Sequence, residues 1–147
     1  MAGGRIDSLR NSYLLMMFQN TTIANIGDAT GLRGSTAAGN LYVALTTTAS
    51  SNSAAGTEAT YTGYARVAVA RTSGGWTIAA NVASNAALVT FGQCTAGSST
   101  VVSFEIWTAA SGGTRLFWGD LASSLAITTS SNQIPEFAIG ALAITAT

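Results

Sequence analysis

The stretch VVSFEIWTAASGGTRLFW, residues 101–118, decides the fold class of this chain. Val102, Phe104 and Ile106 are separated by single residues, which is the period of a β-strand. A Ser-Gly-Gly turn at residues 111–113 follows, and a second apolar run comes after it. Two apolar runs around a glycine-rich turn are typical of a β-hairpin. We therefore predict two antiparallel strands over this stretch.

Similar runs and turns fill the rest of the chain from Asn40 onward. They recur about every ten residues, and this spacing is typical of a β-sandwich or barrel. The further predicted strands lie within residues 41–46, 66–69, 76–78, 87–91, 125–127, 134–137 and 139–145. We therefore predict an all-β protein, an antiparallel β-sandwich of jelly-roll-like form, over residues 39–147.

The N-terminal segment follows a different pattern. Apolar residues at Leu9, Tyr13 and Met16 recur at helical spacing, which predicts a helix over residues 6–19. The next stretch, residues 20–38, is rich in Thr, Asn, Gly and Ser and is expected to form an extended arm. The expected organisation is thus an N-terminal helix and arm over residues 1–38, followed by a β-sandwich domain over residues 39–147.

The most informative feature of the composition is the scarcity of charge. Charged residues make up 8% of the chain and hydrophobic residues 48%, whereas soluble domains typically carry about 25% charged residues. The longest apolar cluster, residues 13–18, falls far short of the roughly 20 residues of a membrane span. We expect neither a membrane segment nor a signal peptide. A surface so poor in charge suits a protein packed against others, because charged residues are depleted at interface cores. We therefore expect a homo-oligomer, a dimer or a trimer.

Binding to nucleic acid is not expected. The net charge is zero, and the 6 basic residues are scattered arginines without a basic run. Nucleic-acid binding requires several cationic side chains on one face.

Catalysis is not expected either. The chain has no histidine, which removes the commonest general base and metal ligand. Its single cysteine, Cys94, therefore has no imidazole to activate it, and a small apolar role at a strand end is the favoured interpretation. Glu105 and Asp120 could form a carboxylate pair across the hairpin, although ion pairing with Arg115 is favoured. We predict no enzymatic activity, no catalytic residues, no cofactor and no metal.

Large apolar and aromatic residues are the candidates for an interface. The 3 tryptophans, at positions 76, 107 and 118, could form a carbohydrate platform, but core and interface roles are favoured for them. The candidate interface residues are Leu9, Tyr13, Met16, Met17, Phe18, Arg33, Trp107 and Trp118.

Five segments of the chain resemble, in order, motifs of a family of small virion proteins of tailed bacteriophages. They are GNLYVAL (39–45), GYARVAV (63–69), NAALVTF (85–91), FEIWTAASGGTRLFWGDL (104–121) and FAIGALAI (137–144). Such proteins are often labelled tail-fibre proteins, and similar small β-sandwiches serve as cement or decoration proteins on capsids. The resemblance brings no catalytic residues. The arm over residues 20–38 departs from the family pattern by its length.

The resemblance implies a capsid cement protein on the outer surface of the virion, which oligomerises and clamps subunits of the major capsid protein. The helix and arm are expected to reach a neighbouring subunit, so that deletion of residues 1–38 would leave a folded sandwich that no longer joins virions. The first alternative is a tail-fibre or receptor-binding component that recognises a host surface glycan. The second is a small hydrolase acting on cell-surface polymer.

Overall fold

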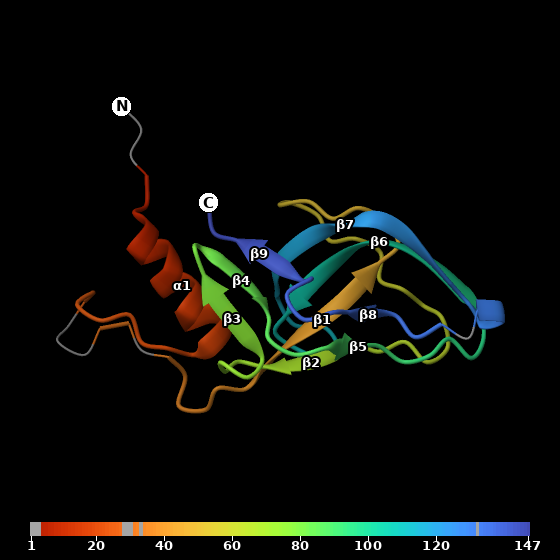
Figure 1. Cartoon of the computed structure of the whole chain (residues 1–147), viewed down its shortest axis with the longest axis horizontal. Helices are drawn as coiled ribbons and strands as arrows, with labels where there is room; N and C mark the ends of the chain where they lie inside the picture. The colour runs from red at the N-terminus through yellow and green to blue at the C-terminus, as the bar shows by residue number, and fades with distance from the viewer. Residues whose placement is uncertain (1–3, 28–30, 33, 132) are drawn as a thin grey trace. The chain divides into compact units, whose positions relative to one another are not determined.

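The computed structural model describes residues 4–27, 31, 32, 34–131 and 133–147. Apart from one helix and a short 3-10 turn, the regular structure in these residues consists of β-strands, and every strand pairing with a stated register is antiparallel (Figure 1). The predicted fold class, an all-β antiparallel sandwich with an N-terminal helix, is therefore confirmed.

The elements follow one another along the chain in the order shown in Figure 1. They are α1 (Asp7–Gln19), β1 (Asn40–Thr46), β2 (Val67–Ala70), β3 (Trp76–Ala79), β4 (Val82–Asn85), β5 (Val89–Thr90), β6 (Ser98–Trp107), β7 (Arg115–Thr128), η1 (Thr129–Ser131), β8 (Glu136–Phe137) and β9 (Ala143–Thr145). The predicted hairpin is β6 and β7. The runs around residues 116–118 and 125–127 belong to one long strand, β7, rather than to two strands.

The chain divides into two compact units. The first comprises Met1–Gly39, Ala70–Ala87 and Ala138–Thr147, and the second comprises Asn40–Val69 and Leu88–Phe137. This division differs from the boundary expected between residues 38 and 39. Strands β3, β4 and β9 share a unit with the helix because the helix packs on β3 and β4.

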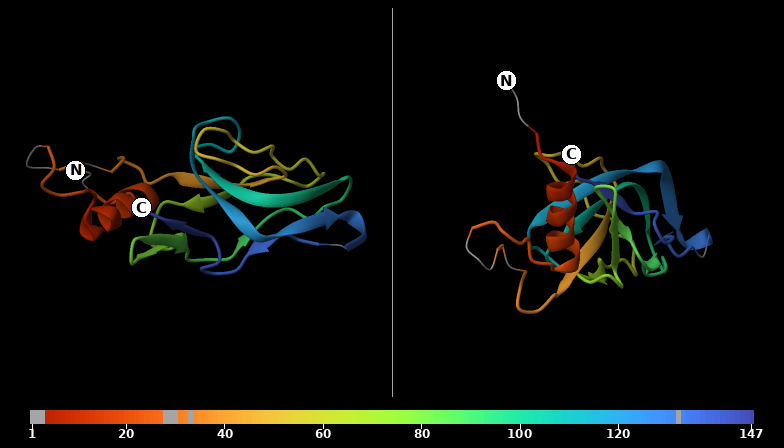
Figure 2. Two further views of the ribbon diagram at one scale, coloured as in Figure 1. Left: turned by 90° about the horizontal axis from the view of Figure 1, so that it is seen from above. Right: turned by 60° about the vertical axis from the view of Figure 1, so that its left-hand side comes forward.

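In the first unit, α1 packs against a sheet of order β3-β4-β9 (Figure 2). Leu14 and Phe18 are fully buried, and the Phe18 ring meets the Trp76 ring edge-on with 4.6 Å between centroids. The helix ends at Gln19, and the capping residue Asn20 that follows is left-handed, with a φ of 56°. The Arg71 guanidinium donates hydrogen bonds to the carbonyl oxygens of Met16 and Met17, at 2.8 and 2.7 Å. A cation at the C-terminal end of a helix satisfies free carbonyls and complements the helix dipole.

In the second unit, a sheet of order β2-β1-β6-β7 is accompanied by the short pair β5-β8 (Figure 1). The side chains of Val43, Val101 and Ile106 are fully buried in the core. Phe137 of β8 contacts the Phe104 ring of β6 edge-on at 5.6 Å, so the two sheets of this unit enclose the core between them.

Candidate functional site

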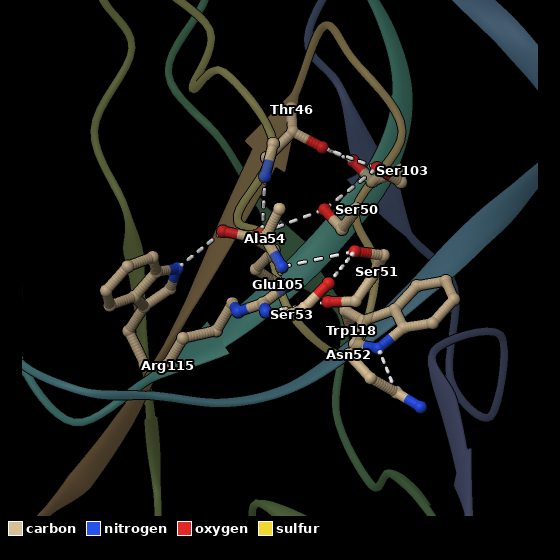
Figure 3. A network of polar contacts seen from close by, with 12 residues as sticks. Thr46, Ser50, Ser51, Asn52, Ser53, Ala54, Ser103, Glu105, Arg115 and Trp118 are labelled. Atoms are coloured by element: carbon tan, nitrogen blue, oxygen red, sulfur yellow. Dashed lines mark hydrogen bonds and ion pairs between the residues drawn. The ribbon is translucent and has the colours of Figure 1, made fainter.

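A buried carboxylate holds the loop formed by residues 47–57, which follows β1 (Figure 3). Glu105 of β6 is 1% exposed. Its Oε1 atom accepts hydrogen bonds from the Ser50 hydroxyl and from the backbone N–H of Gly56, both at 2.8 Å. Its Oε2 atom accepts one from the Trp107 indole at 2.9 Å. Arg115 lies 3.3 Å from Oε1 and completes a buried ion pair.

Hydroxyl groups extend this network beneath the loop (Figure 3). The Ser103 hydroxyl lies 2.5 Å from the Thr46 hydroxyl and 3.4 Å from that of Ser50. It also donates to the Thr48 carbonyl at 3.2 Å. Thr46 and Ser103 are fully buried, and each has a hydrogen-bond partner. Buried polar groups that are satisfied in this way rigidify the segment that they support.

The tip of the loop is also held from β7. The second guanidinium nitrogen of Arg115 donates to the Ser51 carbonyl at 2.7 Å, and the Trp118 indole donates to Asn52 Oδ1 at 3.0 Å. Ser51, Asn52 and Ser53 are exposed at the tip. The loop therefore presents small polar groups to solvent on a fixed frame.

A second cluster fixes the turn between β6 and β7, residues 108–114. Arg66 forms a 3.0 Å ion pair with Glu58 and lies over the Trp107 ring, 4.2 Å from its centroid. Its NH1 group donates to the carbonyls of Ala109 and Gly112, both at 2.9 Å. A planar guanidinium can make these contacts at once, which an ammonium cannot. We refer to the 47–57 loop and the 108–114 turn together as the loop surface.

Tyr64 completes the second cluster. Its hydroxyl donates to Glu58 Oε1 at 2.7 Å and accepts the backbone N–H of Leu45 at 3.0 Å. Burial, and then the hydrogen bond to Glu58, raise the pKa of Tyr64 well above its usual range.

The two carboxylates of the hairpin, Glu105 and Asp120, do not form a pair. Glu105 stands opposite Trp118 in the β6–β7 register, whereas Asp120 stands opposite Ser103 and is exposed. The ion pair of Glu105 with Arg115 agrees with the favoured sequence interpretation. Within the described part of the chain, no three His, Cys, Asp or Glu side chains are grouped so that they could hold a metal ion.

The sequence matches the family described as podophage GP4 fiber I protein gp80, over residues 11–145. The chain belongs to this family. It is thus a structural protein of a bacteriophage virion, as the resemblance of its strand motifs implied; the match leaves the capsid cement role a prediction. A comparison with curated proteins finds no match. No helix in the described residues is long and apolar enough to cross a membrane.

In this gp80-family protein, the predicted interface residues fall in three places. Trp107 and Trp118 are partly exposed and belong to the network of the loop surface. The partly exposed helix residues are Leu9, Tyr13, Met16 and Met17. Phe18 is fully buried and belongs to the core of the first unit, so it has no surface to offer a partner. Arg33 lies outside the described residues.

The residues that hold the loop surface in place have no local signal in the sequence. Ser50 and Gly56 reach Glu105 from 55 and 49 residues away, and they lie in a Ser- and Ala-rich stretch without periodicity. The buried Glu105 itself offered one signal. A carboxylate in an otherwise apolar alternating strand requires partners, and here they come from the 47–57 loop, from Trp107 and from Arg115.

Proposed function

We propose that this chain is a non-enzymatic component of a virion fibre and is anchored to the particle. We further propose that its loop surface binds a glycan on the surface of the host cell. The observation that carries the proposal is the match to a fibre-protein family along residues 11–145, which includes the second compact unit and most of the first.

The loop surface supports a binding role because it is preorganised. The Glu105 and Arg66 clusters fix the 47–57 loop and the 108–114 turn through one buried and one partly buried ion pair and through hydrogen bonds. A loop that is already ordered loses little conformational entropy when it binds. Fixed charge networks beneath exposed small polar side chains are the support that a recognition site needs.

A host surface glycan is the partner that this chemistry favours. The partly exposed indole of Trp118 is hydrogen-bonded to the side-chain amide of Asn52, and the exposed residues Ser51 and Ser53 flank Asn52 in the chain (Figure 3). An aromatic ring can pack on the apolar face of a sugar, and amides and hydroxyls can bind its hydroxyl groups.

Adsorption of phage to host cells tests this proposal. Phage carrying the double substitution Asn52→Ala and Ser53→Ala should assemble normally and bind host cells about tenfold more weakly at equilibrium, since lost hydrogen bonds of about 1.4 kcal/mol in total correspond to one decade in the dissociation constant. Asn40→Ala, an exposed asparagine outside the loop surface, is the matched control and should adsorb like the wild type. Normal adsorption by the double variant would remove the glycan role.

Capsid cement is the second candidate function. Its support is the charged fraction of 8%, which suits a protein that associates with itself and with the major capsid protein through low-charge faces. The two candidates differ in the number of copies on each particle. A fibre component is present in few copies, whereas a cement protein covers the capsid lattice.

A further inference from the structure

Strand β7 is the last strand of its sheet and loses register with β6 over part of its length. It is 14 residues long and hydrogen-bonds to β6 on one side. The pairing of Val101 with Leu125 is followed by that of Ser103 with Asp120, so residues 121–124 of β7 lie opposite a single residue of β6. Such an irregularity leaves backbone N–H and C=O groups outside the ladder.

An apolar cavity lies beside this irregular segment. Its volume is about 250 Å³. Its apolar lining includes Leu45, Phe91, Val101, Leu121, Leu125 and Phe137. Exposed Ala122 and Ser123 also line it, so the cavity opens where β7 leaves the register. A cavity of roughly 150 Å³ already accepts a benzene-sized group, so this one has room for a large apolar side chain.

Unpaired negative charge accompanies the cavity. Three of the described acidic residues form ion pairs with arginine, namely Asp7 with Arg10, Glu58 with Arg66 and Glu105 with Arg115. Asp120 and Glu136 form none with any residue that the structure describes, and both are exposed. Glu136 lines the cavity, and Asp120 precedes Leu121 in the strand. The carboxylate of Glu136 at the cavity and that of Asp120 in the adjoining edge strand therefore favour a cation on the partner.

We infer that the β7 edge at residues 120–125 binds an extended peptide segment of another virion protein. Backbone groups of the segment pair with the free groups of residues 121–124, as in other cases of strand addition to a sheet edge. One apolar side chain of the segment enters the cavity, and a neighbouring Arg or Lys faces Asp120 or Glu136. The inference rests on the proposed function only in taking the partner from the virion.

A second copy of this chain fits this edge poorly. Two β7 edges paired about a two-fold axis would present the same patch to each other, because such an interface is self-complementary. The unpaired carboxylates of Asp120 and Glu136 would then approach those of the other copy, and like charges facing each other across strands are destabilising. A basic segment of a different protein has no such penalty.

Binding to synthetic peptides tests the inference. The probes are overlapping 12-residue peptides that cover the other virion proteins of the same phage and this chain itself, measured by fluorescence polarisation against the purified full-length protein. The expected result is binding by peptides from another virion protein that contain an apolar residue next to Arg or Lys. The absence of binding, selection of peptides without a basic residue, or selection of this chain's own peptides alone would overturn the inference.

Two substitutions locate the binding site. Ala122→Trp fills the mouth of the cavity and should weaken peptide binding at least tenfold, whereas Ala68→Trp, at an exposed alanine in the opposite edge strand β2, should leave it unchanged. Glu136→Gln should weaken binding several-fold and reduce its dependence on salt, because one exposed ion pair is lost. Equal affinity of the Ala122→Trp variant and the wild type would also overturn the inference. Host adsorption, which tests the glycan role, does not involve this edge, so the two proposals can fail separately.

Discussion

At Glu105, four donors converge on a carboxylate that solvent barely reaches: the Ser50 hydroxyl, the Gly56 N–H, the Trp107 indole and the Arg115 guanidinium. A buried carboxylate needs such compensation, because removal from water would otherwise cost several kcal/mol. The partners come from the loop and from both strands of the hairpin. One side chain thereby couples the loop conformation to the sheet.

Glu105→Gln is expected to lower the free energy of unfolding by about 3–5 kcal/mol, because it leaves the Arg115 charge buried without a counter-charge. Urea denaturation measures the change. Asp120→Asn, at an exposed carboxylate, is the control and should stay within about 0.5 kcal/mol of the wild type. A Glu105→Gln variant as stable as the control would contradict the structural role of this residue.

Tyr64 makes the stability of the folded protein depend on pH in the alkaline range. The pKa of its phenol is raised in the folded protein above the ordinary value of 10.0, first by burial and then by Glu58. The phenol therefore stays neutral in the folded protein at a pH where it ionises in the unfolded chain. The resulting contribution to the free energy of unfolding is fully present below pH 10 and is lost as the pH rises above that value.

Tyr64→Phe should cost about 1–2 kcal/mol at pH 8, because the Leu45 N–H loses its acceptor, and should make the decline in stability above pH 10 shallower. Denaturation at pH 8 and at pH 11 measures both effects. Part of the decline should persist, since burial also raises the pKa of Tyr61. An unchanged slope in the variant would show that Tyr64 does not carry this dependence.

Among the elements, strands β6 and β7 pack closely at one glycine that has no room for a side chain. Gly119 stands opposite Phe104, and a Cβ atom at Gly119 would lie 2.6 Å from the Phe104 ring. Gly119→Ala should therefore destabilise the protein by about 1–3 kcal/mol through overpacking. Gly74→Ala is the matched control, because the nearest atom to its Cβ would lie 3.7 Å away. Thermal unfolding of both variants tests this prediction. Equal unfolding midpoints for the two variants would contradict the close packing of Gly119 against Phe104.

The helix α1 is a structural part of the first unit. Phe18→Ala should cost about 3–5 kcal/mol, since it removes a fully buried ring that packs on Trp76. Chemical denaturation followed by tryptophan fluorescence reports directly on this site. For the same reason, deletion of residues 1–38 would uncover Trp76, so we do not expect the truncation to leave the remaining strands undisturbed. A stability loss below about 1 kcal/mol for Phe18→Ala would contradict this packing.

The strands differ in how far local sequence signals predict them. The β6–β7 hairpin was predictable because its two-residue period and Gly-Gly turn are local signals. Strand β4 was missed, because residues 82–85 contain a single large apolar residue and the preceding turn uses Ala80 and Asn81 at positive φ instead of glycine. The tryptophans of the loop surface were predictable as large aromatics, whereas Ser50 and Gly56 act only through partners far away in the chain.

For the whole molecule, most of the charged side chains that the structure describes have a polar partner within the chain. Three of the described acidic residues are paired with arginine, and Arg71 binds carbonyl oxygens at the end of the helix. Ser, Thr, Ala and Gly make up much of the exposed surface that the structure describes, and this composition gives little electrostatic repulsion between copies or partners. This property is common to a fibre component and to a capsid cement protein, so composition alone does not separate them.

The most direct test of the central claim is imaging of the intact virion by cryo-electron microscopy, with the copies of this chain counted on purified particles. We expect a small number of copies, located in a fibre attached to the tail, with the loop surface facing away from the particle. Density for this chain spread over the capsid lattice, with copies in proportion to the major capsid protein, would contradict this expectation and favour the cement role.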